Sequence, residues 1–130
     1  MNTINSAPNN SITNMQQMGH GNTSSICISA GTGCSGYIYN DGGIYGKDGY
    51  LGNLQDILKD KLAQDSEINL EGCNNASGDD NITKRLSEMF PGVNVTGGNG
   101  YQFGYENHWI FGNSSSSWGL KRTYRNGVAK

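Results

Sequence analysis

The stretch Glu67–Gly78, EINLEGCNNASG, contains the pattern that decides how this chain of 130 residues folds. The apolar run Ile68–Leu70 stops shortly before Cys73, and the sequence then changes to small polar residues. A short apolar run of this kind is typical of a buried strand, whereas Asn, Ser and Gly are typical of loops. The stretch therefore predicts a strand with a thiol just beyond its carboxyl end.

A helix is predicted on each side of this strand. From Asn53 to Gln64 apolar residues recur at helical spacing, and Asn53 is a suitable N-cap; these residues are Leu54, Ile57, Leu58 and Leu62. A second helix is marked by Ile82, Leu86, Met89 and Phe90 and is stopped by Pro91-Gly92. Asp79 and Asp80 precede it and are expected to cap its positive end, and Val93–Thr96 is expected to follow as another strand.

Upstream, Ser25–Ser29, SICIS, predicts a short strand that runs into the glycine-rich AGTGCSG. Tyr37–Tyr39 and Ile44–Tyr45 flank the turn sequence NDGG and predict a hairpin. The order strand, hairpin, helix, strand, helix, strand predicts an α/β fold, a small sandwich with a mostly parallel sheet flanked by helices. Ser25–Ser29, Ile68–Leu70 and Val93–Val95 are expected to be parallel neighbours.

The two ends of the chain are predicted to differ from this centre. Residues 1–23 are rich in Asn, Ser, Gln and Met without helical or strand periodicity, so they are expected to form a flexible leader. Residues 24–130 are then a single domain. After Gly97, aromatic residues alternate with glycines around Ser114–Ser117, which predicts a C-terminal antiparallel β extension.

Composition argues against several function classes. The net charge is −2 and no basic stripe is present, so nucleic acid is not an expected partner. No apolar run is long enough to span a membrane, and no signal-peptide pattern occurs. Three cysteines without CxxC spacing and two distant histidines indicate neither a metal site nor a cofactor. At least one thiol is therefore expected to be free or paired with another chain.

Two segments together carry a resemblance, ICISAGTGCSGYIY and INLEGCNNASGDDNITKRLSEMFPGVNVTG. They resemble clan CD cysteine peptidases of the caspase and clostripain kind, and most closely the caspase-like domains at the C-termini of bacterial Rhs-type and RTX toxins. Those domains pair an apolar strand ending in His-Gly with a second apolar strand ending in Ala/Gly-Cys. The resemblance implies that Cys73 is the nucleophile and that Gly31 and the amide of Cys73 form the oxyanion hole.

The sequence departs from the family pattern at Ala30, which takes the position of the expected histidine. Alanine cannot accept a proton, so the chain would lack its general base and lose several orders of magnitude in rate. Either a natural pseudoenzyme or a His-to-Ala change explains this residue. His20 and His108 are expected to be surface or packing histidines, Cys34 is a weak rival nucleophile, and Cys27 is expected to be buried in the sheet.

The function that the resemblance implies is a cysteine peptidase, the effector or processing domain of a secreted bacterial toxin. Its activity would be lost or strongly reduced because Ala30 takes the place of the general-base histidine. Its partners would be a peptide or protein substrate and an immunity protein, and it would be secreted or delivered into a target cell. The alternative from another class is a binding module without catalysis that recognises a peptide or an immunity protein. Without the resemblance, Cys73 would be interpreted as a small buried residue at a strand end.

Overall fold

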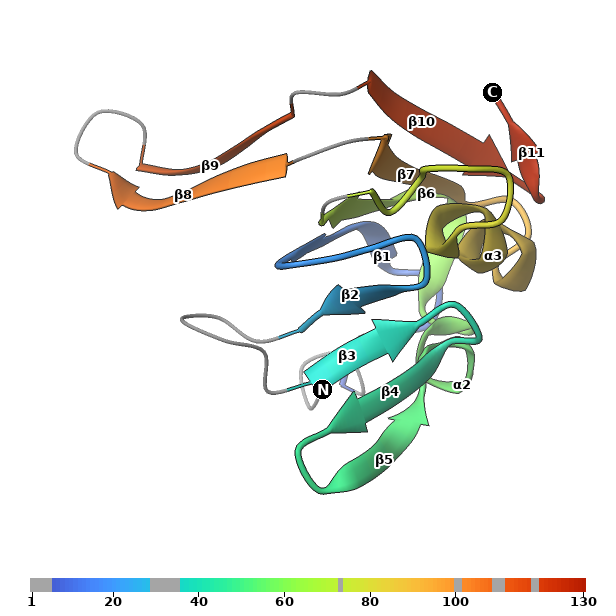
Figure 1. Ribbon diagram of the computed structural model, residues 1–130. Helices are drawn as coiled ribbons and strands as arrows, with labels where there is room; N and C mark the ends of the chain where they lie inside the picture. The colour runs from blue at the N-terminus through green and yellow to red at the C-terminus, as the bar shows by residue number, and fades with distance from the viewer. Residues whose placement is uncertain (1–5, 29–35, 73, 100–101, 109–111, 118–119) are drawn as a thin grey trace.

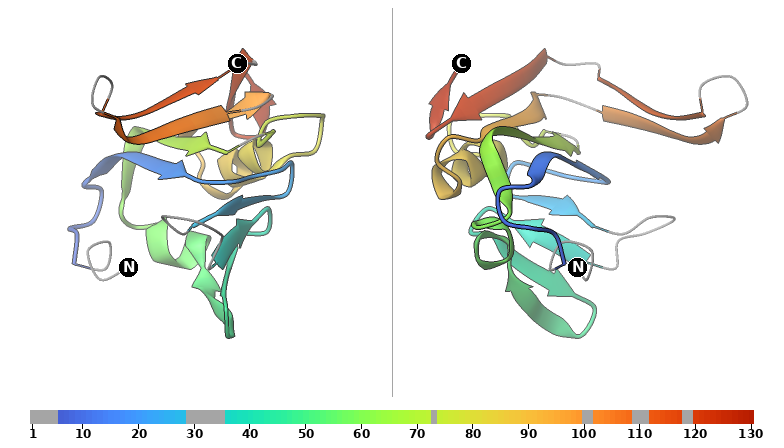
Figure 2. Two further views of the ribbon diagram at one scale, coloured as in Figure 1. Left: turned by 60° about the vertical axis from the view of Figure 1, so that its left-hand side comes forward. Right: turned by 180° about the vertical axis from the view of Figure 1, so that it is seen from behind.

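The computed structural model describes residues 6–28, 36–72, 74–99, 102–108, 112–117 and 120–130. Within them the chain is mostly β-structure, with two helices, and Figures 1 and 2 show two sheets side by side with a long hairpin projecting from one end. The predicted α/β sandwich with a mostly parallel, helix-flanked sheet is therefore wrong. The strands are β1 (Ile12–Met18), β2 (Ser25–Cys27), β3 (Gly36–Tyr39), β4 (Gly43–Gly46), β5 (Gly49–Asn53), β6 (Leu62–Glu71), β7 (Asn94–Asn99), β8 (Gln102–His108), β9 (Gly112–Ser117), β10 (Leu120–Arg125) and β11 (Val128–Ala129), and the helices are α2 (Leu54–Leu58) and α3 (Ile82–Met89).

The larger sheet is mixed and has the strand order β1-β6-β7-β10-β11. β6 runs parallel to both β1 and β7, whereas β10 is antiparallel to β7 and to β11. Ile68 pairs with Val95, which confirms the predicted parallel pairing of Ile68–Leu70 with Val93–Val95. The antiparallel half arises because the chain returns through the β8–β9 hairpin, so that β10 enters beside β7 from the opposite direction.

The second sheet is antiparallel, with the order β2-β3-β4-β5. The predicted hairpin is present as β3 and β4, joined by a turn in which Gly42 has a φ of +82°. β2 pairs antiparallel with β3, so the prediction that Ser25–Ser29 lies parallel to Ile68–Leu70 is wrong. The physical reason is local: β3 presents Ile38 on the face that carries Ile26, and both are buried in the common core.

The predicted helix from Asn53 to Gln64 is reduced to the single turn α2. Asn53 is its N-cap, as predicted, and its side chain accepts a hydrogen bond from the backbone N–H of Gln55 at 2.9 Å. The N–H of Lys61 then donates to the carbonyl of Leu58 at 2.9 Å and closes the turn. Leu62 follows in β6, opposite Ile12 of β1, where its side chain is buried in the core.

β1 lies within the predicted flexible leader. Its residues pair with β6 in parallel register, and the backbone N–H of Ile12 donates to the carbonyl of Lys61 at 2.9 Å. β1 is an edge strand with one exposed face, so it needs few apolar residues, and Met15 packs partly buried against the core. This explains why an Asn- and Gln-rich segment forms a strand without strong apolar alternation.

One hydrophobic core joins the two sheets. It contains Ile26, Ile38 and Ile44 from the smaller sheet together with Ile68, Leu70 and Val95 from the larger one. α3 contributes Ile82 and Leu86 and packs against β7 and β10, and its end at Met89 before Pro91-Gly92 agrees with the prediction. The two sheets are thus one packed body, and loops from both reach the edge described next.

Candidate active site

The carboxyl ends of β1 and β6 lie side by side at one edge of the larger sheet. Met18 at the end of β1 is the register partner of Glu71 at the end of β6. The next residues are Gly19, His20 and Gly21 on one side and Gly72 on the other. In sheets with parallel strands, functional residues gather at this end, because the loops there converge.

The loops after β1 and β6 pack directly against each other. A Cβ on Gly72 would lie 3.2 Å from the carbonyl oxygen of Gly19 and would collide with the side chain of Asn75. A Cβ on Gly21 would lie 2.7 Å from Nδ2 of the same Asn75. Only glycine fits at either position. The backbone at Gly21 and the backbone at Gly72 therefore both lie directly against the side chain of Asn75.

Asn75 holds this arrangement together. It is fully buried, and its Nδ2 donates to the carbonyls of Asn22 at 2.8 Å and Ser25 at 3.0 Å. Its backbone carbonyl accepts a hydrogen bond from Oγ1 of Thr83 in α3 at 2.8 Å. Its Oδ1 has no hydrogen-bond partner among the described residues. The loop after β6 is therefore fixed to the loop after β1 and to α3.

The backbone around His20 is fixed by a bridge between Gly21 and Ile26. The N–H of Cys27 donates to the carbonyl of His20 at 2.7 Å, and the N–H of Asn22 donates to the carbonyl of Ser25 at 3.0 Å. In such an antiparallel bridge the N–H and carbonyl of Gly21 itself point away from β2. The side chain of His20 is exposed. An anchored loop thus presents an accessible imidazole at the sheet edge.

Cys27 is 1% exposed, which confirms its predicted burial, but it is also disulfide-bonded, which the sequence did not indicate. The chain has two other cysteines, Cys34 and Cys73, and both lie outside the described residues. Gln17 Nε2 donates to the carbonyl of Cys27 at 3.0 Å and connects this residue to β1.

The three predicted site residues, Ala30, Gly31 and Cys73, also lie outside the described residues. The reason for placing Ala30-Gly31 opposite Cys73 was a parallel strand at Ser25–Ser29, and that strand belongs to the other sheet. On the side of β6 away from β7 lies β1, which ends at Met18, and His20-Gly21 follows it after Gly19. A His-Gly pair soon after a candidate strand is the sequence signal that could have identified this position.

A buried carboxylate lies at the same edge. The side chain of Glu71 is 6% exposed, and Nζ of Lys121 approaches its Oε1 at 3.1 Å. Gln16 Nε2 in β1 donates to the same oxygen at 3.4 Å. Glu71 therefore joins β1 and β10 to the end of β6, which stabilises the strand from which Gly72 follows.

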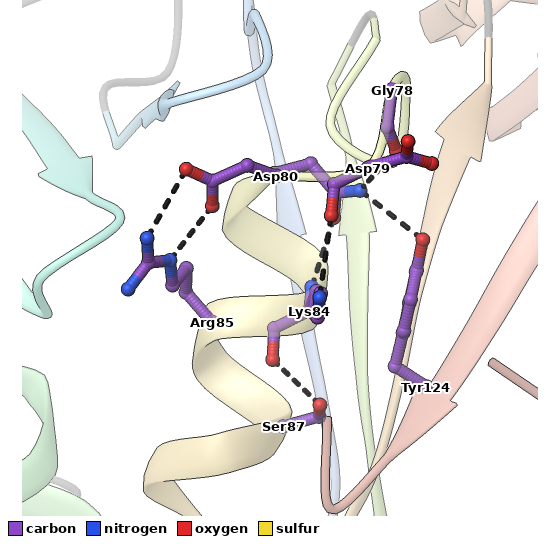
Figure 3. Close-up of polar contacts among 8 residues, drawn as sticks. Gly78, Asp79, Asp80, Lys84, Arg85, Ser87 and Tyr124 are labelled. Atoms are coloured by element: carbon purple, nitrogen blue, oxygen red, sulfur yellow. Dashed lines mark hydrogen bonds and ion pairs between the residues drawn. The ribbon is translucent and has the colours of Figure 1, made fainter. Parts of the chain in front are cut away.

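The acidic pair before α3 has a structural role (Figure 3). Arg85 donates two hydrogen bonds to the Asp80 carboxylate, at 2.8 and 3.1 Å, and these hold the pKa of Asp80 below its usual range. The N-cap is Asn81, whose side chain accepts the N–H of Lys84 at 2.9 Å, so neither Asp79 nor Asp80 is the capping residue that the sequence predicts. Asp80 stabilises the helix start through its ion pair instead.

In the part of the chain that the structure describes, no group of three His, Cys, Asp or Glu side chains is placed to hold a metal ion. No helix within the described ranges has the length and apolar character needed to cross a membrane. Comparison with family models, curated proteins and solved structures gives no match to this chain.

Proposed function

We propose that the protein is a cysteine-dependent peptidase with Cys73 as nucleophile and His20, in place of the residue expected at position 30, as general base. The observation that carries this proposal is the parallel pairing of β1 with β6, which brings His20-Gly21 and Gly72 to one edge. Gly72 precedes Cys73, and Asn75 follows it by two residues. A Cβ on Gly72 would lie 3.2 Å from the carbonyl oxygen of Gly19, and a Cβ on Gly21 would lie 2.7 Å from Nδ2 of Asn75, so both residues lie close to the segment that carries His20. His20-Gly21 shortly after β1, with Gly72-Cys73 directly after β6, resembles the pattern of those peptidases, in which one strand ends in His-Gly and a second ends in Ala/Gly-Cys.

The chemistry requires a thiolate, a base and an oxyanion donor. His20 takes the thiol proton, and the Cys73 sulfur attacks an amide carbonyl, forming a C–S bond. The C–N bond then breaks, the amine leaves with the proton from the imidazolium, and a thioester remains. Water that gives its proton to His20 hydrolyses the thioester to a carboxylic acid and the free thiol. The N–H of Gly21 points away from β2 and supports a role as oxyanion donor.

The substrate of this proposal is a peptide or protein, and the biological role is that of an effector or processing domain of a secreted toxin. If His20 is the general base, catalysis does not require a histidine at position 30, and Ala30 does not abolish it. The native chain is therefore expected to be active once Cys73 is a free thiol, so the assays need a reductant because Cys27 is disulfide-bonded.

The chain offers a matched test, since it has two histidines. His20→Ala should reduce thiol-dependent cleavage of a peptide library, or self-cleavage, by about a hundredfold or more, as should Cys73→Ala, whereas His108→Ala should not. Alkylation of Cys73 by iodoacetamide near neutral pH should also slow in His20→Ala, because an adjacent imidazole promotes the thiolate.

The same assays distinguish the rival assignments. Activity that is unchanged in His20→Ala would reject His20 as the general base. Activity that appears only in Ala30→His would instead place the general base at position 30, as the resemblance implies. If neither the native chain nor Ala30→His cleaves any peptide while folded and reduced, the result would favour a binding module for a peptide or an immunity protein.

A further inference from the structure

Four tyrosines form a continuous row on the outer face of the smaller sheet. Tyr37 and Tyr39 alternate in β3 with Ile38, which points into the core, and Tyr45 and Tyr50 come from β4 and β5. The ring centroids of successive members, Tyr37, Tyr39, Tyr45 and Tyr50, are 6.1, 5.4 and 5.4 Å apart. We call this set the tyrosine row.

The tyrosine row is exposed although its rings are large and mainly apolar. Its members are 36%, 39%, 39% and 61% exposed in chain order. The rings meet at tilted or edge-to-face angles, which is a favourable arrangement and holds each ring in place. A contiguous aromatic patch that the core does not require is characteristic of a binding surface.

Polar side chains lie at one side of the row. A hollow of about 400 Å³ is lined by Tyr39, Tyr45, Asn40 and Asp41. Oδ1 of Asp41 accepts the N–H of Gly43 at 2.7 Å, which fixes the orientation of the carboxylate. A carboxylate only accepts hydrogen bonds, whereas the Asn40 amide both donates and accepts.

The tyrosine row together with the Asn40-Asp41 turn favours some classes of ligand over others. The charged residues of the β3–β4 and β4–β5 turns are Asp41, Lys47 and Asp48, so an anionic nucleic acid would meet more negative than positive charge. A proline-rich peptide offers carbonyl acceptors and no N–H at its prolines, which does not suit the acceptor-only carboxylate of Asp41. Sugar rings present flat C–H faces that suit the negative faces of tyrosine rings, and hydroxyls that donate to a carboxylate.

We infer that the tyrosine row and the Asn40-Asp41 turn form a binding site for a neutral oligosaccharide. Successive sugar rings lie along Tyr37, Tyr39, Tyr45 and Tyr50, and hydroxyl groups of one sugar donate to the Asp41 carboxylate. The site lies on the outer face of the smaller sheet and shares no residue with the proposed peptidase site. The two proposals therefore stand or fall separately.

The test is an NMR titration of the full, unreduced chain, with cellotetraose and tetra-N-acetylchitotetraose as probes. At least one probe should cause saturable shifts in the amides of β3, β4 and β5. Tyr45→Ala should weaken binding by about tenfold or more, Tyr45→Phe by less than about threefold, and Asp41→Asn by an intermediate factor. Leu51→Ala is the matched control, because Leu51 is 65% exposed and follows Tyr50 on the opposite face of β5.

Several results would overturn the inference. One is the absence of shifts in these strands with both probes while the spectrum shows a folded protein. Another is binding that Tyr45→Ala leaves unchanged or that Leu51→Ala weakens equally. Saturable binding of a proline-rich decapeptide or of single-stranded DNA to the row, with neither sugar binding, would assign it to those partners instead.

Discussion

Asn81 connects three parts of the molecule through one side chain. Its Oδ1 caps α3 at the N–H of Lys84, while its Nδ2 donates to the carbonyl of Gly78 at 3.0 Å and to the hydroxyl of Tyr124 in β10 at 3.2 Å. The side chain is fully buried. α3 is thus tied to the loop that follows the candidate active site and to the far half of the larger sheet (Figure 3).

Replacing Asn81 with Ala should therefore cost more than an ordinary cap. We expect a loss of about 2–3 kcal/mol in the free energy of unfolding, because a cap contributes about 1 kcal/mol and the Tyr124 hydroxyl would lose a buried partner. Asn53→Ala, which removes the cap of the short α2, should cost about 1 kcal/mol or less. Urea denaturation of both variants measures the difference, and equal losses would contradict the tertiary role of Asn81.

The ion pair of Asp80 gives a prediction about pH. Hydrogen bonding by Arg85 lowers the pKa of Asp80 in the folded state, so this pair contributes stability above the unfolded-state pKa. The contribution disappears as the pH falls through the folded-state pKa. Both side chains are exposed, so the effect is small.

Asp80→Asn should consequently be slightly less stable than the wild type at neutral pH, and the difference should shrink in acid below the ordinary aspartate range. Denaturant unfolding at several pH values measures this, with Asp79→Asn as the control variant. A difference that stays constant down to strongly acidic pH would show that the ion pair is not its source.

At the scale of elements, β1 is the strand that changes the interpretation of the chain. It has Asn and Gln at three of its seven positions and lies at the sheet edge, yet it aligns with β6 along most of its length. Its register places His20 beyond the same edge as Gly72. An apolar pattern does not identify such a strand, because only one of its faces meets the core.

The amides of residues 12–18 should therefore exchange with solvent far more slowly than those of a disordered leader. Strand pairing on one side protects alternate N–H groups, so mass-resolved hydrogen exchange should show partial but long-lived protection. Complete exchange of this segment within the first measured interval would contradict its strand structure.

A pair of substitutions tests how β1 packs. Met15 lies partly buried against the core, whereas Thr13 is exposed. Met15→Asn should lower the free energy of unfolding by about 1–2 kcal/mol, and Thr13→Asn by less than about 0.5 kcal/mol, in thermal or urea unfolding. Similar effects from both would mean that β1 contributes no core packing.

At the scale of the whole molecule, the two sheets share one core, and Cys27, which is 1% exposed, is disulfide-bonded. Reduction should lower the free energy of unfolding by about 2–4 kcal/mol, the usual range for a native disulfide. Thiol titration of the denatured protein should give one thiol per chain before reduction and three after it. Three thiols before reduction would show that the disulfide does not form in solution.

Peptide mapping under non-reducing conditions connects this disulfide to the proposed function. Pairing of Cys27 with Cys34 leaves Cys73 available as nucleophile in the oxidised protein. Pairing with Cys73 makes peptidase activity strictly dependent on reductant. Activity that is retained in an oxidised protein with a mapped Cys27–Cys73 bond would exclude Cys73 as the nucleophile.

The sequence alone determined those local features that are stabilised by residues close to them in the sequence. These are the Asn53 cap, the β3–β4 hairpin, the end of α3 at Pro91-Gly92 and the burial of Cys27. The parallel pairing of Ile68 with Val95 also follows from local elements, because a strand, a helix and a strand in succession form a single crossover.

Only the tertiary structure decided which strands lie together. Ser25–Cys27 pairs with the adjacent hairpin, and Ile12–Met18 lies beside β6, so that His20 follows β1 at the same sheet edge as Gly72. Partner choice depends on contacts between residues some 50 positions apart, such as Met18 with Glu71. Neither hydrophobic period nor turn chemistry encodes such contacts, since both describe only a residue's near neighbours.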